Sequence, residues 1–134
     1  MPKKLEHIGI AVANLDASEK LFKKLLGVDS YKREEVESEG VITSFFLLGD
    51  VKIELLAATK PDSPIAKFIE KKGEGIHHLA FESENIENEL KEKENLGFTL
   101  INNAPKDGAD NKNIAFLHPK STNSVLVELC QDKS

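Results

Sequence analysis

The chain has 134 residues, of which 40% are hydrophobic and 31% are charged, a balance typical of one soluble globular domain. Its formal net charge of −5 argues against general nucleic-acid binding, although a few lysines in one cleft could still hold an anionic small molecule. No apolar run approaches the roughly 20 residues of a membrane span. No signal-peptide stretch precedes Glu6, and the single cysteine, Cys130, excludes an internal disulfide, so we expect a cytoplasmic protein.

The first half of the chain predicts a strand, a helix and three further strands. Residues 5–12, in which Ile8, Ile10 and Val12 alternate with other residues, predict a buried strand. Asp16 can cap the following helix, Glu19 three residues later would complete a capping box, and Gly27 can end the helix. Three strands are expected near residues 30–37, 41–48 and 51–57.

A linking helix and a second set of elements follow. Ser63-Pro64 is a good helix start and Lys71-Lys72-Gly73 a good helix end, so we expect a short helix over about 63–72. A strand at 76–83 and a helix at 86–96 come next, and the polar stretch 102–112 reads as a loop. The remaining strands are expected near residues 98–101, 113–118 and 124–130.

The two halves repeat the same landmarks in the same order. His78 follows His7 by 71 residues, and Glu128 follows Glu54 by 74. Gly27 and Gly97, which end the two helical stretches, lie 70 residues apart. We therefore predict an α+β fold of two tandem βαβββ modules with curved mixed sheets, within one domain over residues 1–134. Module one covers about residues 5–58 and module two about 76–131.

The repeated histidines and glutamates are candidate metal ligands. Taken alone, each is more simply read as a surface or satisfied polar side chain. Equivalent positions in two copies would be related by a pseudo-twofold axis, so four such side chains can converge if the sheets curve toward each other. Two imidazoles and two carboxylates suit a divalent ion such as Co, Ni, Mn, Zn or Mg. The predicted ligands are His7, Glu54, His78 and Glu128.

The chain has two other histidines, His77 and His118. His77 neighbours His78, but consecutive residues of a strand face opposite ways, and the repeat selects His78. We therefore read His77 as structural. His118 stands at a strand end, where it is either a ligand contact or a turn residue.

The order of elements and the His/Glu/His/Glu set resemble the vicinal-oxygen-chelate superfamily, which includes the glyoxalases. Within it the chain resembles the methylmalonyl-CoA epimerase family from about Leu5 to about Leu129. The matching segments are His7-Ile8-Gly9-Ile10-Ala11-Val12, Ile53-Glu54-Leu55-Leu56, Asp62-Ser63-Pro64-Ile65-Ala66-Lys67-Phe68, Gly73-Glu74-Gly75-Ile76-His77-His78-Leu79-Ala80-Phe81 and Ala115-Phe116-Leu117-His118-Pro119-Lys120-Ser121.

This resemblance implies a divalent-metal-dependent isomerase that interconverts (R)- and (S)-methylmalonyl-CoA by removing and returning the proton at C2. It implies Glu128 as ligand and proton carrier. Some family members carry a second glutamate where Thr43 stands here, and a threonine cannot easily be that base, so Glu54, Glu39 or a metal-bound water could be the second carrier.

The chain is also expected to contact coenzyme A and a second copy of itself. Loop position suggests coenzyme A contacts at Lys120, Ser121 and Lys112. Paired modules often bury apolar sheet edges in a dimer, so we expect a homodimer. Two alternatives stay open: a glyoxalase I-type lactoylglutathione lyase with the same ligand set, and a non-catalytic binding protein on the same fold.

Overall fold

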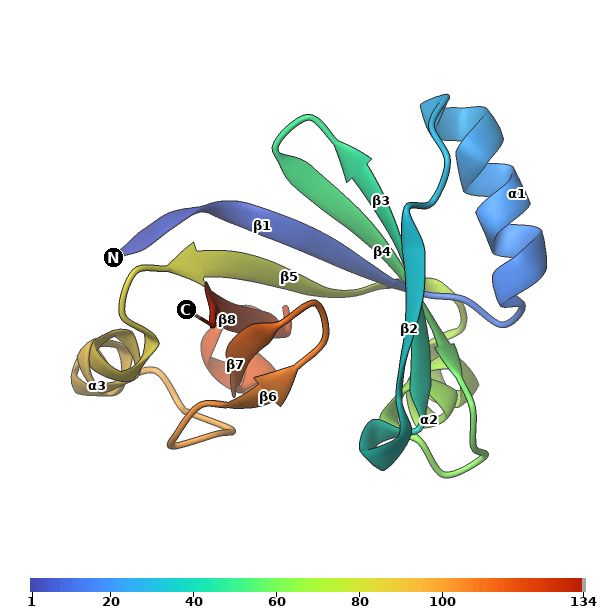
Figure 1. Ribbon diagram of the computed structural model, residues 1–134. Coiled ribbons are helices and arrows are strands. Elements are labelled where there is room, and N and C mark those ends of the chain that lie inside the picture. Colours follow the sequence, from blue (N-terminus) through green and yellow to red (C-terminus); the bar gives the residue numbers. More distant parts are fainter. Residues whose placement is uncertain (134) are drawn as a thin grey trace. The chain divides into compact units, whose positions relative to one another are not determined.

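The computed structural model describes residues 1–133 and divides into two compact units. The N-terminal unit holds His7–His77. The C-terminal unit holds Met1–Glu6 together with the chain from His78 onward. Each unit contains one four-stranded mixed sheet with helices, and the predicted α+β class with two βαβββ modules is confirmed (Figure 1). Among residues 1–133, no helix has the length and apolarity needed to cross a bilayer.

The sheet of the N-terminal unit has the order β2-β3-β4-β1. Strands β1 and β4 are parallel, whereas β2–β3 and β3–β4 are antiparallel. A short 3-10 helix, Glu37–Glu39, joins β2 to β3. The elements of this unit are β1 (Pro2–Ala11, shared with the other unit), α1 (Leu15–Leu26), β2 (Lys32–Val36), β3 (Val41–Leu48), β4 (Val51–Ala58) and α2 (Pro64–Lys72).

Helix α1 begins differently from the prediction. The cap is Asn14, whose side chain accepts a hydrogen bond from the backbone N–H of Ala17, and not Asp16. No capping box forms, because Glu19 accepts hydrogen bonds from Arg33 and from Ser44 on the sheet. Helix α2, in contrast, begins as predicted, since Ser63 caps it and Pro64 occupies its first turn.

The sheet of the C-terminal unit has the order β5-β8-β7-β6, with β5 and β8 parallel. The strand predicted at 98–101 is wrong, because there only Leu100 makes an isolated bridge to Leu117. The polar stretch read as a loop contains β6, which pairs antiparallel with β7. The elements are β5 (Gly75–Ser83), α3 (Ile86–Asn95), β6 (Lys106–Gly108), β7 (Lys112–Leu117), a 3-10 helix (Pro119–Ser121) and β8 (Val127–Asp132).

In each unit one face of the sheet packs against the helix that follows the first strand. In the N-terminal unit this core is formed by Val12, Leu15, Phe46, Leu55 and Ala57. In the C-terminal unit it is formed by Ile86, Leu90, Ala115, Leu117 and Leu129. Because side chains alternate along a strand, the residues between these core positions lie on the opposite face, which we call the open face of each unit.

Candidate metal centre

His7 and Glu54 form a buried pair on the open face of the N-terminal unit. Strands β1 and β4 pair in a register that places Gly9 opposite Glu54, so His7, two residues before Gly9, lies on the same face. The Nδ1 atom of His7 is 3.1 Å from Oε2 of Glu54. Both residues are at most 6% exposed. The pair therefore offers one imidazole nitrogen and one carboxylate from neighbouring strands.

His78 and Glu128 form the same kind of pair in the C-terminal unit. Here β5 and β8 are parallel and Ala80 lies opposite Glu128, which again puts the histidine two residues earlier on the same face. Nε2 of His78 is 3.3 Å from Oε1 of Glu128. Both side chains are buried, and the edge of the imidazole contacts the ring of Phe116 at a centroid distance of 5.9 Å. In both modules, therefore, the same register between two parallel strands brings one histidine and one glutamate together.

His77 points away from this pair, as strand alternation predicts. Its ring meets Phe68 of α2 edge-on at a centroid distance of 4.9 Å. Burial lowers the pKa of the His77 imidazole, and the positive charge of Lys72 lowers this pKa further. A mostly buried, neutral histidine that packs on a phenylalanine has a structural role in the N-terminal unit.

The residues suggested for coenzyme A have different surroundings. Lys120 is exposed at the 3-10 helix after β7. The hydroxyl of Ser121 donates to the carbonyl of His118 and accepts from the N–H of Thr99. His118 itself accepts a hydrogen bond from the N–H of Lys120 through Nδ1, the geometry of a turn residue. Of these side chains, Lys120 is the one that presents an exposed cation.

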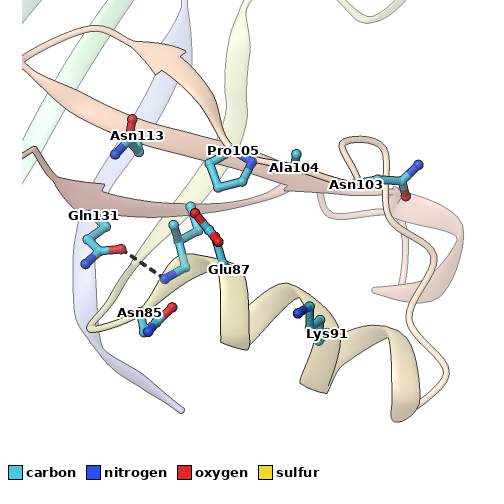
Figure 2. A pocket seen from close by; sticks show the side chains of 9 residues that line it. Asn85, Glu87, Lys91, Asn103, Ala104, Pro105, Asn113 and Gln131 are labelled. Carbon is cyan, nitrogen blue, oxygen red and sulfur yellow. Dashed lines mark hydrogen bonds between the residues drawn. The ribbon is translucent and has the colours of Figure 1, made fainter.

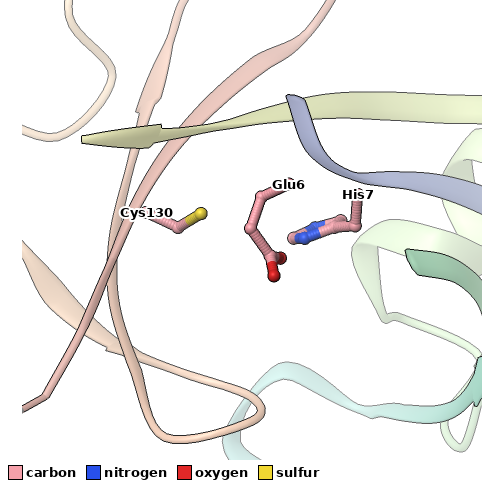
Figure 3. A group of neighbouring side chains, drawn as sticks. All are labelled: Glu6, His7 and Cys130. Atoms are coloured by element: carbon pink, nitrogen blue, oxygen red, sulfur yellow. The ribbon is translucent and has the colours of Figure 1, made fainter. Parts of the chain in front are cut away.

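Lys112 belongs to a buried ionic cluster that sequence reasoning missed. Its ammonium lies 3.6 Å from a carboxylate oxygen of Glu6 and contacts the carboxylate of Asp132. Glu6 also lies near the buried thiol of Cys130, within 4.8 Å between ligand-type atoms (Figure 3). Charged residues are rarely buried without partners, so the ion pairs explain why Glu6 and Lys112 are tolerated in the interior. Glu6 stands among polar residues at the start of the chain, and nothing in their pattern indicates that it is buried.

A pocket of about 640 Å³ opens on the helix side of the C-terminal unit, away from its His–Glu pair. The side chain of Gln131 bridges two segments there, because it accepts from the N–H of Ile86 and donates to the carbonyl of Glu84. Figure 2 shows the polar residues that line it, among them Asn85, Glu87, Lys91, Asn103 and Asn113. Gln131 neighbours Cys130 and so lies on the face of β8 opposite to Glu128.

Comparison with known proteins identifies the family of this chain. The model of the glyoxalase/bleomycin resistance protein/dioxygenase superfamily matches residues 6–116. The chain belongs to this glyoxalase superfamily.

Members of the glyoxalase superfamily that resemble this chain include an uncharacterized protein of Bacillus subtilis, 41% identical over 97% of this chain and 93% of the relative. A mitochondrial methylmalonyl-CoA epimerase of Dictyostelium discoideum is 41% identical over 94% of this chain and 76% of the relative. Among solved structures, a methylmalonyl-CoA epimerase of Streptomyces coelicolor in complex with 2-nitronate-propionyl-CoA has a TM-score of 0.95, with 29% identity over 100% of this chain and 97% of that one.

The superfamily typically binds a divalent metal ion. The two His–Glu pairs fit such an ion by their chemistry. Each brings a buried nitrogen ligand and a buried oxygen ligand to neighbouring positions on a sheet. Imidazole and carboxylate together suit borderline and hard divalent cations.

Proposed function

We propose that this chain is a methylmalonyl-CoA epimerase whose two His–Glu pairs together bind one divalent ion. The observation that carries the proposal is the duplicated pair: each module offers the same two ligand types from the same strand register. Relatives named as methylmalonyl-CoA epimerases, 36–41% identical to the chain, support the substrate. The proposed ligands are His7, Glu54, His78 and Glu128.

The chemical problem is the C–H bond between a thioester and a carboxylate. A divalent cation at the four ligands would stabilise the negative charge that develops on the thioester oxygen as the proton leaves. We propose Glu128 as one proton carrier at C2, since it is a buried carboxylate on the open face of its unit. His78 pairs with it, and the ring of Phe116 contacts the His78 imidazole edge-on. Glu54 is the candidate for the second carrier among the four ligands.

The coenzyme A part of the substrate needs cationic contacts for its phosphates. We propose Lys120 for this role, because its ammonium is exposed beside the turn that His118 and Ser121 hold together. Ser121 would contribute its backbone or hydroxyl at the same turn. Lys112 remains the third proposed contact, and it would have to leave its ion pairs with Glu6 and Asp132 to reach a phosphate.

The assay that tests the function compares two substrates. The metal-loaded chain should exchange the C2 proton of methylmalonyl-CoA with deuterium from solvent and interconvert the two epimers, as followed by NMR. The alternative glyoxalase activity predicts turnover of a glutathione hemithioacetal. If the chain turns over the hemithioacetal and leaves C2 of methylmalonyl-CoA unexchanged, the proposed substrate is wrong.

We also propose a homodimer. Leu21 and Leu25, one helical turn apart on α1, are 59% and 69% exposed, and an apolar strip of this kind is a candidate contact surface between copies. Sedimentation equilibrium should give the dimer mass at micromolar concentration, and Leu25→Glu should shift it toward the monomer. A monomer for the unmodified chain would contradict this part.

A further inference from the structure

The proposed epimerisation needs two proton carriers, because one proton must leave C2 on one side and another must arrive on the opposite side. Glu128 supplies one. Glu54 is the corresponding buried glutamate of the N-terminal unit, and its carboxylate lies 3.1 Å from the imidazole of His7. A second carrier outside the proposed ligand set would leave all four ligands in place during turnover. Other acids on the same face of the N-terminal unit therefore become the candidates.

Strand register places Glu34 on that face. Phe45 lies opposite Glu54 in the β3–β4 pairing, and Lys32 lies opposite Phe45 in the β2–β3 pairing. Glu34 follows Lys32 by two residues and lies opposite Thr43, so all five side chains share the open face. Directly opposite side chains in an antiparallel pair approach closely, and the side chain of Glu34 is longer than that of Thr43.

The carboxylate of Glu34 is held by charge and still reaches water. Its Oε1 is 3.3 Å from Nζ of Lys32, which in turn lies over the ring of Phe45 at 5.0 Å from the centroid. Phe45 is fully buried and so provides a fixed support for the Lys32 ammonium. The Glu34 side chain is 34% exposed, and it can exchange a proton with solvent between turnovers.

The opposite side of β2 fixes the strand that carries Glu34. Arg33 donates to Glu19 of α1 through Nε at 2.7 Å and to Asp16 through Nη2 at 2.6 Å. Glu19 also accepts from the hydroxyl of Ser44 on β3. A terminal strand of a sheet would otherwise fray, so this network keeps Glu34 at a constant place relative to β3 and β4.

Glu34 stands at a position where the two modules differ. In the C-terminal unit Phe116 lies opposite Glu128, as Phe45 lies opposite Glu54 in the N-terminal unit. The position equivalent to Thr43 is then Ile114, and Lys106 pairs with it where Glu34 would stand. The N-terminal module thus has a carboxylate at this position, and the C-terminal module has an ammonium group at the equivalent one. This difference suits a reaction that needs the additional carboxylate in only one module.

We propose that Glu34 is the second proton carrier, a role that rests on the proposed epimerase function. For one epimer, the Glu34 carboxylate takes the C2 proton, and the electrons of the broken C–H bond pass into the enolate. Glu128, starting as the carboxylic acid, then delivers its proton to the opposite side of C2. The reverse reaction exchanges the two roles, and solvent restores the starting protonation of both carboxylates.

Stereospecific exchange in deuterated water tests the proposal on the metal-loaded chain. Glu34→Gln should reduce interconversion of the epimers by about 10²–10⁴-fold, the usual contribution of a proton carrier. It should abolish C2 exchange for one epimer and keep it for the other, whereas Glu128→Gln should show the opposite preference. Glu34→Asp should recover part of the lost rate. The Co²⁺ affinity of Glu34→Gln, measured spectroscopically, should equal that of the unmodified chain.

Glu35→Gln is the matched control, because Glu35 is the next residue of β2, carries the same charge and faces the opposite side. It should keep the interconversion rate within about twofold. If Glu34→Gln interconverts the epimers at the rate of the control, Glu34 is only a surface charge on a terminal strand, and the proposal is overturned. Equal loss of exchange for both epimers, or loss of Co²⁺ binding, would also overturn it. If the unmodified chain fails to exchange C2 of either epimer, the proposed function itself is wrong.

Discussion

Nδ1 of His7 lies 3.1 Å from Oε2 of Glu54 because β1 and β4 run parallel with Gly9 opposite Glu54. The ligand atoms of two strands are thus brought together by backbone pairing before any ion binds. A preformed pair of this kind loses little conformational entropy on metal binding. The same reasoning applies to His78 and Glu128 in the C-terminal unit.

Removing either member of the first pair should weaken metal binding. His7→Ala and Glu54→Gln should each lower the affinity for Co²⁺ or Zn²⁺ by at least about 100-fold, since loss of an outer-shell partner alone costs 10–100-fold. Isothermal titration of the metal-free chain measures this. His118→Ala is the control, because His118 is exposed and caps a turn. Unchanged affinity in the His7 variant would remove that residue from the ligand set.

Glu128 should be required for chemistry at C2. Glu128→Gln keeps an oxygen ligand but cannot accept a proton, so C2 exchange of methylmalonyl-CoA should fall by about 10²–10⁴-fold. Deuterium incorporation followed by NMR gives the rate. Glu84→Gln, at a side chain that is 77% exposed, should exchange normally. A Glu128→Gln variant with near-normal exchange would show that another group carries the proton.

Gly40 should be less replaceable than Gly49, although both have a positive φ. Gly40 has φ of +63°, and a Cβ there would lie 2.9 Å from Cβ of Ser63. Gly49 has φ of +61° and nothing within 4 Å of an added Cβ. Gly40→Ala should therefore lower the free energy of unfolding by about 2–4 kcal/mol, and Gly49→Ala by about 1–2 kcal/mol. Urea denaturation compares them, and equal losses would show that the Ser63 contact relaxes freely.

Glu19 should contribute stability that depends on pH. The hydrogen bond from Arg33 holds the pKa of the Glu19 carboxyl below its ordinary value of 4.5, with a further contribution from Ser44, while partial burial opposes the shift. The folded state thus favours the ionised form, so this stability is complete well above pH 4.5 and is lost as pH falls through the lowered pKa. Glu19→Gln should cost about 1–2 kcal/mol at pH 7 and clearly less near pH 3, as urea unfolding would show. A pH-independent difference would contradict this assignment.

Much of this fold could be predicted because two periodicities repeat along the chain. Apolar alternation located β3 to the residue, and Ser63-Pro64 located the start of α2, since both depend on local chemistry. The start of α1 was misplaced because Asp16 and Asn14 are both capable caps, and the choice depends on Arg33, which draws Asp16 and Glu19 away. Distant partners of this kind leave no local signal.

The candidate site likewise combines residues that the sequence pattern identifies with residues that only the structure identifies. The duplication of His7 and Glu54 as His78 and Glu128 was visible in the sequence, and strand alternation separated His78 from His77. Glu34 was not distinguished, because it stands in a charged run of Lys32, Arg33, Glu34 and Glu35 that reads as a solvated strand. Only the cross-strand register shows which members of that run share a face with Glu54.

The number of divalent ions that each chain binds tests the central claim most directly. The two His–Glu pairs could each bind an ion separately, or they could share one, and the proposed chemistry requires sharing. Metal-free protein should be dialysed against Co²⁺ and its metal content determined by mass spectrometry. We predict one ion per chain, lost on either His7→Ala or His78→Ala. Two ions per chain, or none, would contradict the shared centre.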